Sequence, residues 1–132
     1  MEAIISKKYK IIITTSTTDF PRSHELSAAI ILAAHFEKNI TFIRPGQKKT
    51  PDINVSGIMW EIKSPKGGGK KTIENNLRTA RRQSSNIIID LRRSQLHQNK
   101  AEARIHHYLK SGPHRIKRLK IITKAQKIID VL

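Results

Sequence analysis

Asp52, Glu61 and Lys63 combine two carboxylates and an amine at a spacing that suits phosphate chemistry. The dipeptide Ser56-Gly57 is typical of a two-residue hairpin turn, which would place Asp52 directly opposite Glu61. Lys63 follows Glu61 by two residues, so it would project from the same face of the ribbon. The same turn sets three further cross-strand pairs: Ile53 with Trp60, Asn54 with Met59, and Val55 with Ile58. The pattern therefore predicts two acids about 5 Å apart with an ammonium group beside them.

Two carboxylates at that separation repel, so a divalent cation, the Lys63 ammonium or a shared proton must offset the repulsion. Mg²⁺ is the favoured cation, because it binds carboxylate oxygens and keeps several waters; Mn²⁺ and Zn²⁺ are alternatives. Asp52 and Glu61 would hold the metal, and Lys63 would position the attacking water or stabilise the charge on the phosphate. The alternative is that Asp52 is a turn residue and Glu61 and Lys63 form a surface ion pair. Spacing alone leaves both interpretations open.

The charge balance indicates a polyanionic partner. The 132 residues include 26 Lys and Arg against 10 Asp and Glu, a formal net charge of +16. Such an excess repels itself, and nucleic acid is its usual counterpart; a membrane surface, an acidic protein and a merely solvated basic surface are the alternatives. The candidate nucleic-acid-binding residues are Lys66, Lys70, Lys71, Thr72, Asn75, Arg78, Arg81, Arg82, Arg92 and Arg93. Thr72 and Asn75 would offer amides at a helix start to phosphate, or else serve only as a cap and its partner.

Several classes of protein are excluded by composition. The chain has no cysteine, which excludes disulfides and thiolate metal sites, and no apolar stretch approaches the roughly 18 residues of a membrane span. Its N-terminus lacks the pattern of a signal peptide, so a signal for export would lie elsewhere, on a larger parent chain. The length corresponds to a single domain with one modest core.

The hydrophobic pattern predicts an α/β fold, a mixed central sheet flanked by helices. Strands are expected over residues 11–15, 40–43, 52–55, 58–64, 86–91, 117–123 and 127–131, the last being a strand or a short helix. Helices are expected over residues 23–39, 72–83 and 99–110, capped at Ser23 and Thr72. The predicted buried residues are Leu26, Ala29, Ile30 and Ala33 on the first helix, Ile73, Leu77 and Ala80 on the second, and Ala101, Ile105, Tyr108 and Leu109 on the third.

Pro51-Asp52, followed after eight residues by Glu61-Ile62-Lys63, resembles the signature of the PD-(D/E)xK nuclease superfamily. Three segments look closer still to the C-terminal toxin domains of CdiA-type contact-dependent growth inhibition proteins: Trp60-Glu61-Ile62-Lys63-Ser64-Pro65, Lys71-Thr72-Ile73-Glu74-Asn75-Asn76, and the run from Asn86 to Arg93. The first resemblance implies an αβββαβ core within a single nuclease domain over residues 1–132, with 22–132 as the catalytic core and 1–20 as an appendage.

The second resemblance implies a metal-dependent endonuclease toxin that cuts tRNA and is inhibited by an acidic cognate immunity protein. It also implies delivery from another bacterial cell, at the end of a larger exported protein, to a site of action in the cytoplasm. A DNA endonuclease with the same site and a non-catalytic nucleic-acid-binding module are the competing functions.

Two further acids each have two interpretations. By the superfamily resemblance, Glu25 matches an acidic residue that joins the metal site; otherwise it is a first-turn glutamate favoured by the helix dipole. Asp90 ends a predicted central strand, where it would be either the buried partner of an arginine or a member of the site.

Overall fold

Strands and helices alternate along the chain, as the hydrophobic pattern predicts, and the mixed α/β class is confirmed. The computed structural model describes residues 2–6, 8–14, 20–44 and 50–132. These residues divide into two compact units, Met1–Trp60 and Glu61–Leu132. Strand β5 (Ile58–Lys63) contributes its first half to one unit and its second half to the other.

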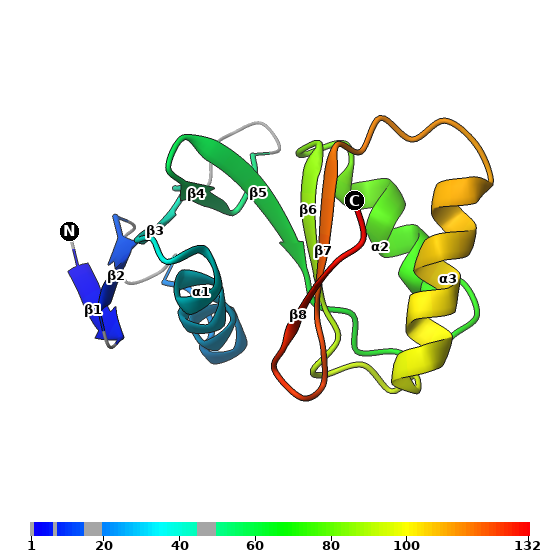
Figure 1. Cartoon of the computed structure of the whole chain (residues 1–132), viewed down its shortest axis with the longest axis horizontal. Helices are drawn as coiled ribbons and strands as arrows, with labels where there is room; N and C mark the ends of the chain where they lie inside the picture. Colours follow the sequence, from blue (N-terminus) through cyan, green and yellow to red (C-terminus); the bar gives the residue numbers. More distant parts are fainter. Residues whose placement is uncertain (1, 7, 15–19, 45–49) are drawn as a thin grey trace. The chain divides into compact units, whose positions relative to one another are not determined.

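The first unit is a mixed sheet with a helix on one face. Its strands, in spatial order, are β1 (Glu2–Ser6), β2 (Tyr9–Ile13), β3 (Ile40–Phe42), β4 (Ile53–Val55) and the start of β5. β2 and β3 are parallel and joined through α1 (Ser23–Phe36), whereas the other neighbours are antiparallel. Figure 1 shows α1 beside β2 and β3. Its core consists of Ile11, Ile13, Ala28, Ala29, Leu32, Ala33, Ile40, Phe42, Ile53, Val55 and Trp60.

Several expectations for the first unit are wrong in detail. Strand β1 was not expected, and α1 begins after Arg22 as the N-cap rather than at a Ser23 cap. The helix ends at Phe36 because Glu37 adopts a left-handed conformation with φ 55°. Ile30 is exposed, and Ala28 and Leu32 are buried instead of Ile30 and Leu26. The helix is apolar around most of its circumference, so periodicity does not select the buried face.

The hairpin between β4 and β5 is the tight turn that the sequence predicts. Ser56 and Gly57 both have positive φ, 51° and 90°, as a type I′ turn requires. The side-chain Oδ1 of Asn54 accepts a hydrogen bond from the Gly57 N–H at 2.7 Å. The three cross-strand pairs that this turn predicts are confirmed: Ile53 with Trp60, Asn54 with Met59, and Val55 with Ile58.

The second unit is a sheet of three parallel strands and an antiparallel edge strand. Its strands are the end of β5, β6 (Asn86–Asp90), β7 (Arg118–Ile122) and β8 (Ile128–Asp130), in that order. The crossovers are α2 (Thr72–Ala80) and α3 (Gln98–Lys110), which lie on the same side of β6 and β7 in Figure 1. The predicted helix faces are confirmed: Ile73, Leu77, Ala80, Ala101 and Ile105 are buried, and Tyr108 and Leu109 pack against them. The cap predicted at Thr72 is wrong, because Lys71 is the N-cap of α2 and Thr72 is its first helical residue.

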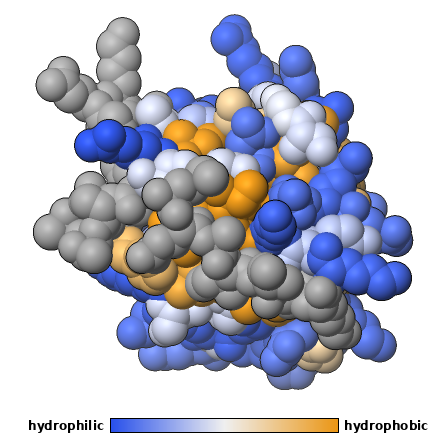
Figure 2. Space-filling view, turned by 90° about the vertical axis from the view of Figure 1, so that its left-hand side faces the viewer, coloured by the Kyte–Doolittle hydropathy of each residue, from blue (hydrophilic) through white to orange (hydrophobic). Residues whose placement is uncertain are grey.

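The surface of the described residues is hydrophilic with local apolar patches. In Figure 2, hydrophobic side chains gather in the middle of one face and hydrophilic side chains border them. Phe20, Ile30, Ile58 and Met59 in the first unit are each more than a third exposed. Among the described residues, no helix has the length and apolar character of a membrane span.

Candidate active site

Glu61 and Lys63 form a buried ion pair near the end of β5. The Lys63 Nζ lies 3.1 Å from the Glu61 Oε2, and the side chains are 23% and 2% exposed, respectively. A carboxylate with so little access to water is costly unless a charge or hydrogen bonds compensate it. The Glu61 carboxylate is therefore inside the protein, whereas the Lys63 side chain is partly exposed.

Strand register places this pair on the helix side of the second unit. Glu61 pairs with Ile87, and Lys63 pairs with Ile89, in the parallel ladder with β6. Paired residues of adjacent strands project to the same face, and Ile87 and Ile89 belong to the core beneath α2 and α3. The Glu61 carboxylate is thus held against a packed core, where its position is well defined.

Asp90, at the end of β6, is engaged by an arginine. It is completely buried, and its Oδ1 accepts hydrogen bonds from the Arg92 N–H at 3.1 Å and the Arg92 Nε–H at 2.9 Å. Its Oδ2 accepts from Arg92 Nη2 at 2.7 Å. The interpretation of Asp90 as the buried partner of an arginine is confirmed. Arg92, which the sequence offers as a phosphate ligand, holds this acid, and its side chain is 15% exposed.

Asp52 lies just before β4, in the first unit, and its backbone bonds to a residue just after β3 and to one in β5. Its carbonyl accepts from the Ile43 N–H at 2.9 Å, and its N–H donates to the Trp60 carbonyl at 3.0 Å. In the described residues the β4–β5 register ends at Ile53 and Trp60, so the predicted direct pairing of Asp52 with Glu61 is wrong. Asp52 and Ile53 both face Trp60, as two residues of a β-bulge face one, and a bulge re-aims the extra side chain.

The loops that follow the parallel strands of the second unit are tied together at one edge. Arg93 donates from Nε to the Ser64 Oγ at 3.0 Å and from Nη2 to the Ser64 carbonyl at 3.3 Å. The Gln95 N–H donates to the Lys66 carbonyl at 3.1 Å, and the Lys124 Nζ donates to the Ser94 carbonyl. The carboxyl ends of parallel strands are where ligands bind in α/β sheets. The sequence pattern did not indicate Ser64 or Lys124. Ser64 comes directly after β5 and Lys124 two residues after β7, which is the signal that could have found them.

The remaining predicted phosphate ligands are mostly exposed. Lys66, Lys70, Lys71, Asn75, Arg78, Arg81 and Arg82 are exposed, and Thr72 and Arg93 are partly buried. Some already have protein contacts: Arg78 Nη1 donates to the Asn75 Oδ1 at 3.0 Å, and Arg81 lies over the Tyr108 ring at 6.0 Å. The exposed cations of α2 and its preceding loop provide positive surface in the second unit.

Glu25 lies in the first turn of α1, in the first unit. Its Oε1 accepts a hydrogen bond from the Arg22 N–H at 3.0 Å, which is the bond expected of a first-turn acid at a helix start. Within the described residues, no three His, Asp or Glu side chains converge closely enough to hold a metal.

Comparison with known proteins defines the family. Residues 48–128 match the contact-dependent growth inhibition CdiA C-terminal domain. This match spans more than half of the chain, so the chain belongs to that family and is a toxin domain. The fold is similar to a structure described as the CdiA-CT/CdiI toxin and immunity complex from Burkholderia pseudomallei, with a TM-score of 0.57 and 20% identity, covering 90% of this chain and 97% of that chain. At that identity the likeness shows a shared fold. The comparison with curated proteins gave no match.

Proposed function

We propose that this toxin domain is an endonuclease that hydrolyses phosphodiester bonds in tRNA, with Asp52, Glu61 and Lys63 as its active site in a PD-(D/E)xK-type core. The observation that carries the proposal is the ion pair of Glu61 and Lys63, 3.1 Å apart, with the carboxylate buried at the end of β5. In open α/β sheets, ligands bind at the carboxyl ends of the parallel strands, and this pair lies near that end of β5. The net charge of +16 supports a nucleic-acid substrate.

Asp52 and Glu61 would hold a divalent cation. Mg²⁺ is favoured over Mn²⁺ or Zn²⁺, because both residues offer carboxylate oxygens, the ligands that Mg²⁺ prefers. The Asp52 N–H donates to the carbonyl of Trp60, the residue before Glu61, so the Asp52 backbone lies beside β5. Mg²⁺ needs only one or two carboxylates, since it keeps several of its own waters. When bound, such an ion supplies neutralising charge at the phosphate and lowers the pKa of a coordinated water.

Lys63 is the residue that would act on the reacting phosphate. Its side chain is partly exposed, and its ammonium lies 3.1 Å from the Glu61 carboxylate. From there it would donate a hydrogen bond to the phosphate oxygen on which charge develops, or to the attacking water. Glu25 would assist the acids. The exposed cations from Lys66 to Arg82, together with Arg93, would hold the RNA backbone.

The similar structure is a complex of a toxin with an immunity protein. We propose that an acidic immunity protein likewise binds this chain and covers its basic surface, since opposite charges speed and orient association. The family implies delivery from another bacterial cell as the end of a larger exported protein. The domain would act in the recipient's cytoplasm, where tRNA is found.

The test is cleavage of total tRNA and of supercoiled plasmid by wild type, Asp52→Ala and Glu61→Ala, each with and without EDTA. The proposal predicts that wild type cuts tRNA and leaves plasmid intact, that EDTA stops cleavage, and that both variants still bind tRNA without cutting it. Cleavage of plasmid instead would indicate a DNA endonuclease. Binding by all three proteins without any cleavage would indicate a non-catalytic module.

A further inference from the structure

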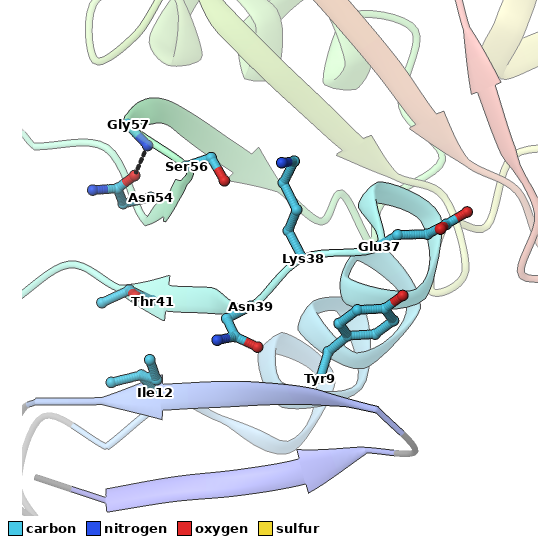
Figure 3. Close-up of a pocket in the computed structure, with 9 residues that line it drawn as sticks. All are labelled: Tyr9, Ile12, Glu37, Lys38, Asn39, Thr41, Asn54, Ser56 and Gly57. Carbon is cyan, nitrogen blue, oxygen red and sulfur yellow. Dashed lines mark hydrogen bonds between the residues drawn. The ribbon is translucent and has the colours of Figure 1, made fainter.

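The first unit contains an open pocket, and none of its lining residues belongs to the predicted active site. Its volume is about 560 Å³, within the range of small-ligand pockets, and it lies on β2, β3, the end of α1 and the β4–β5 turn. Its lining residues are Tyr9, Ile12, Glu37, Lys38, Asn39, Thr41, Asn54, Ser56 and Gly57. Figure 3 shows Lys38 extending toward the turn and the Glu37 carboxylate pointing away from it.

Two asparagines in this pocket have fixed orientations. The Asn39 Oδ1 accepts a hydrogen bond from the Lys10 N–H at 2.9 Å, and the Asn54 Oδ1 accepts from the Gly57 N–H at 2.7 Å. A backbone N–H can only donate, so each bond identifies the side-chain oxygen and leaves the NH₂ group as the free end. Both asparagines therefore present hydrogen-bond donors.

The polar groups of the pocket are available to a ligand. In the parts of the chain that the structure describes, no hydrogen bond engages the NH₂ groups of Asn39 and Asn54, the Lys38 ammonium or the Thr41 hydroxyl. Strand register places Ile12, Thr41 and Asn54 in one row across the sheet, beside each other on the same face. The pocket thus combines an apolar side chain, several hydrogen-bond donors and one cation.

We propose that this pocket holds one nucleotide of the RNA substrate, splayed out of a single-stranded loop. This inference rests on the proposed function and adds a substrate-binding site to it. Proteins recognise unpaired RNA bases through aromatic or apolar contacts and hydrogen bonds to the base edges. Ile12 would contact the base, the amides of Asn39 and Asn54 would donate to its acceptors, and Lys38 would contact the phosphate.

The pocket is tested first by NMR on the ¹⁵N-labelled full chain carrying Lys63→Ala, titrated with AMP, CMP, GMP, UMP and inorganic phosphate. The proposal predicts that at least one nucleotide shifts the side-chain NH₂ signals of Asn39 and Asn54, and that phosphate alone does not. If no nucleotide shifts them, or phosphate shifts them equally, the pocket is not a nucleotide site. This readout does not need cleavage, so a failure of the pocket proposal can be told apart from a failure of the proposed nuclease activity.

The second test is the kinetics of tRNA cleavage by Asn39→Asp and Asn54→Asp. Aspartate keeps the oxygen that accepts the backbone N–H but replaces the donor with an acceptor, so KM should rise about tenfold with kcat unchanged. Asn99→Asp, an exposed position on α3, makes the same charge change outside the pocket and should leave KM within about twofold. Lys38→Gln, at an exposed position, serves as a second variant and should raise KM as well. Equal KM values for all four variants and wild type would overturn the proposal.

Discussion

Two acid–cation pairs on neighbouring strands of the second unit share one sequence pattern and differ in their chemistry. Glu61 and Lys63 on β5, like Asp90 and Arg92 at the end of β6, are separated by one residue. Arg92 contacts both oxygens of Asp90 and also bonds through its backbone N–H, whereas Lys63 approaches Glu61 Oε2 as a point charge at 3.1 Å. Register places the two acids on opposite faces of the sheet. Glu61 pairs with Ile87 and shares its face, whereas Asp90, three residues after Ile87 on β6, projects from the other face.

The difference indicates which pair is structural. The planar guanidinium matches a carboxylate in a two-point contact, which stabilises one geometry and consumes the oxygens of the acid. An ammonium on a flexible chain holds its acid less completely and can also donate to a third group. We therefore assign Asp90 and Arg92 to stability and keep Glu61 and Lys63 for the proposed chemistry.

The largest expected effect is on stability at Asp90. Asp90→Ala leaves the guanidinium of Arg92, only 15% exposed, without its acid, and should lower the free energy of unfolding by about 3 kcal/mol. Asp130→Ala is the matched control, because Asp130 pairs with Lys120 but is 63% exposed; it should cost less than about 1 kcal/mol. Urea denaturation measures both. Equal costs would remove the structural assignment of Asp90.

Glu61→Gln should reduce cleavage strongly and stability only slightly. The proposed chemistry requires the charge of this acid, so single-turnover cleavage of tRNA should fall roughly 100- to 1,000-fold. The amide fills the same space, and Lys63 is exposed enough to reach water, so stability should fall less than for Asp90→Ala. If Glu61→Gln still cleaves tRNA, and Asp90→Ala is folded but inactive, the catalytic and structural assignments of the two pairs would have to be exchanged.

Arg93→Ala should have an intermediate effect. It removes two hydrogen bonds to Ser64, the neighbour of Lys63, and should reduce the cleavage rate about tenfold, equivalent to roughly 1.4 kcal/mol. Arg118→Ala is the control: this arginine bonds to Asn86 at the start of the adjacent strands, at 2.9 Å, and its loss should leave the rate unchanged. A similar loss in both variants would point to a general effect of charge.

The smallest effect is expected for the exposed cations within α2 and just after it. Arg78→Ala and Arg82→Ala should each weaken tRNA binding and reduce the slope of log affinity against log salt by about 0.7 to 0.9. Arg22→Ala, an exposed arginine in the first unit, should not change the slope. Fluorescence anisotropy at several salt concentrations measures this. An unchanged slope in the α2 variants would exclude these residues as phosphate contacts.

The sequence predicts the second unit better than the first, for physical reasons. The run from Asn86 to Asp90 is apolar enough to be a central strand, and α2 and α3 each have one apolar stripe. In the first unit, α1 is apolar on most sides, so its buried face could not be predicted. The sequence of β1 has no alternating pattern, so this strand was not predicted.

The candidate site was predicted in part. The turn at Ser56 and Gly57 and three cross-strand pairs follow from local rules. The bulge at Asp52 depends on its bond to Ile43, just after β3, and spacing does not encode such a tertiary contact. The pattern of acid, one residue, cation is equally present at Glu61 and Asp90, and both acids are buried. Only the side-chain geometry of the two pairs distinguishes them.

The most direct test of this account is single-turnover cleavage of total tRNA by Lys63→Ala, with tRNA binding measured in parallel at the same salt concentration. If Lys63 acts on the phosphate, the rate should fall at least about 100-fold while the dissociation constant changes little. A rate near that of wild type, or a loss of rate fully explained by weaker binding, would contradict the assignment of the Glu61–Lys63 pair to catalysis.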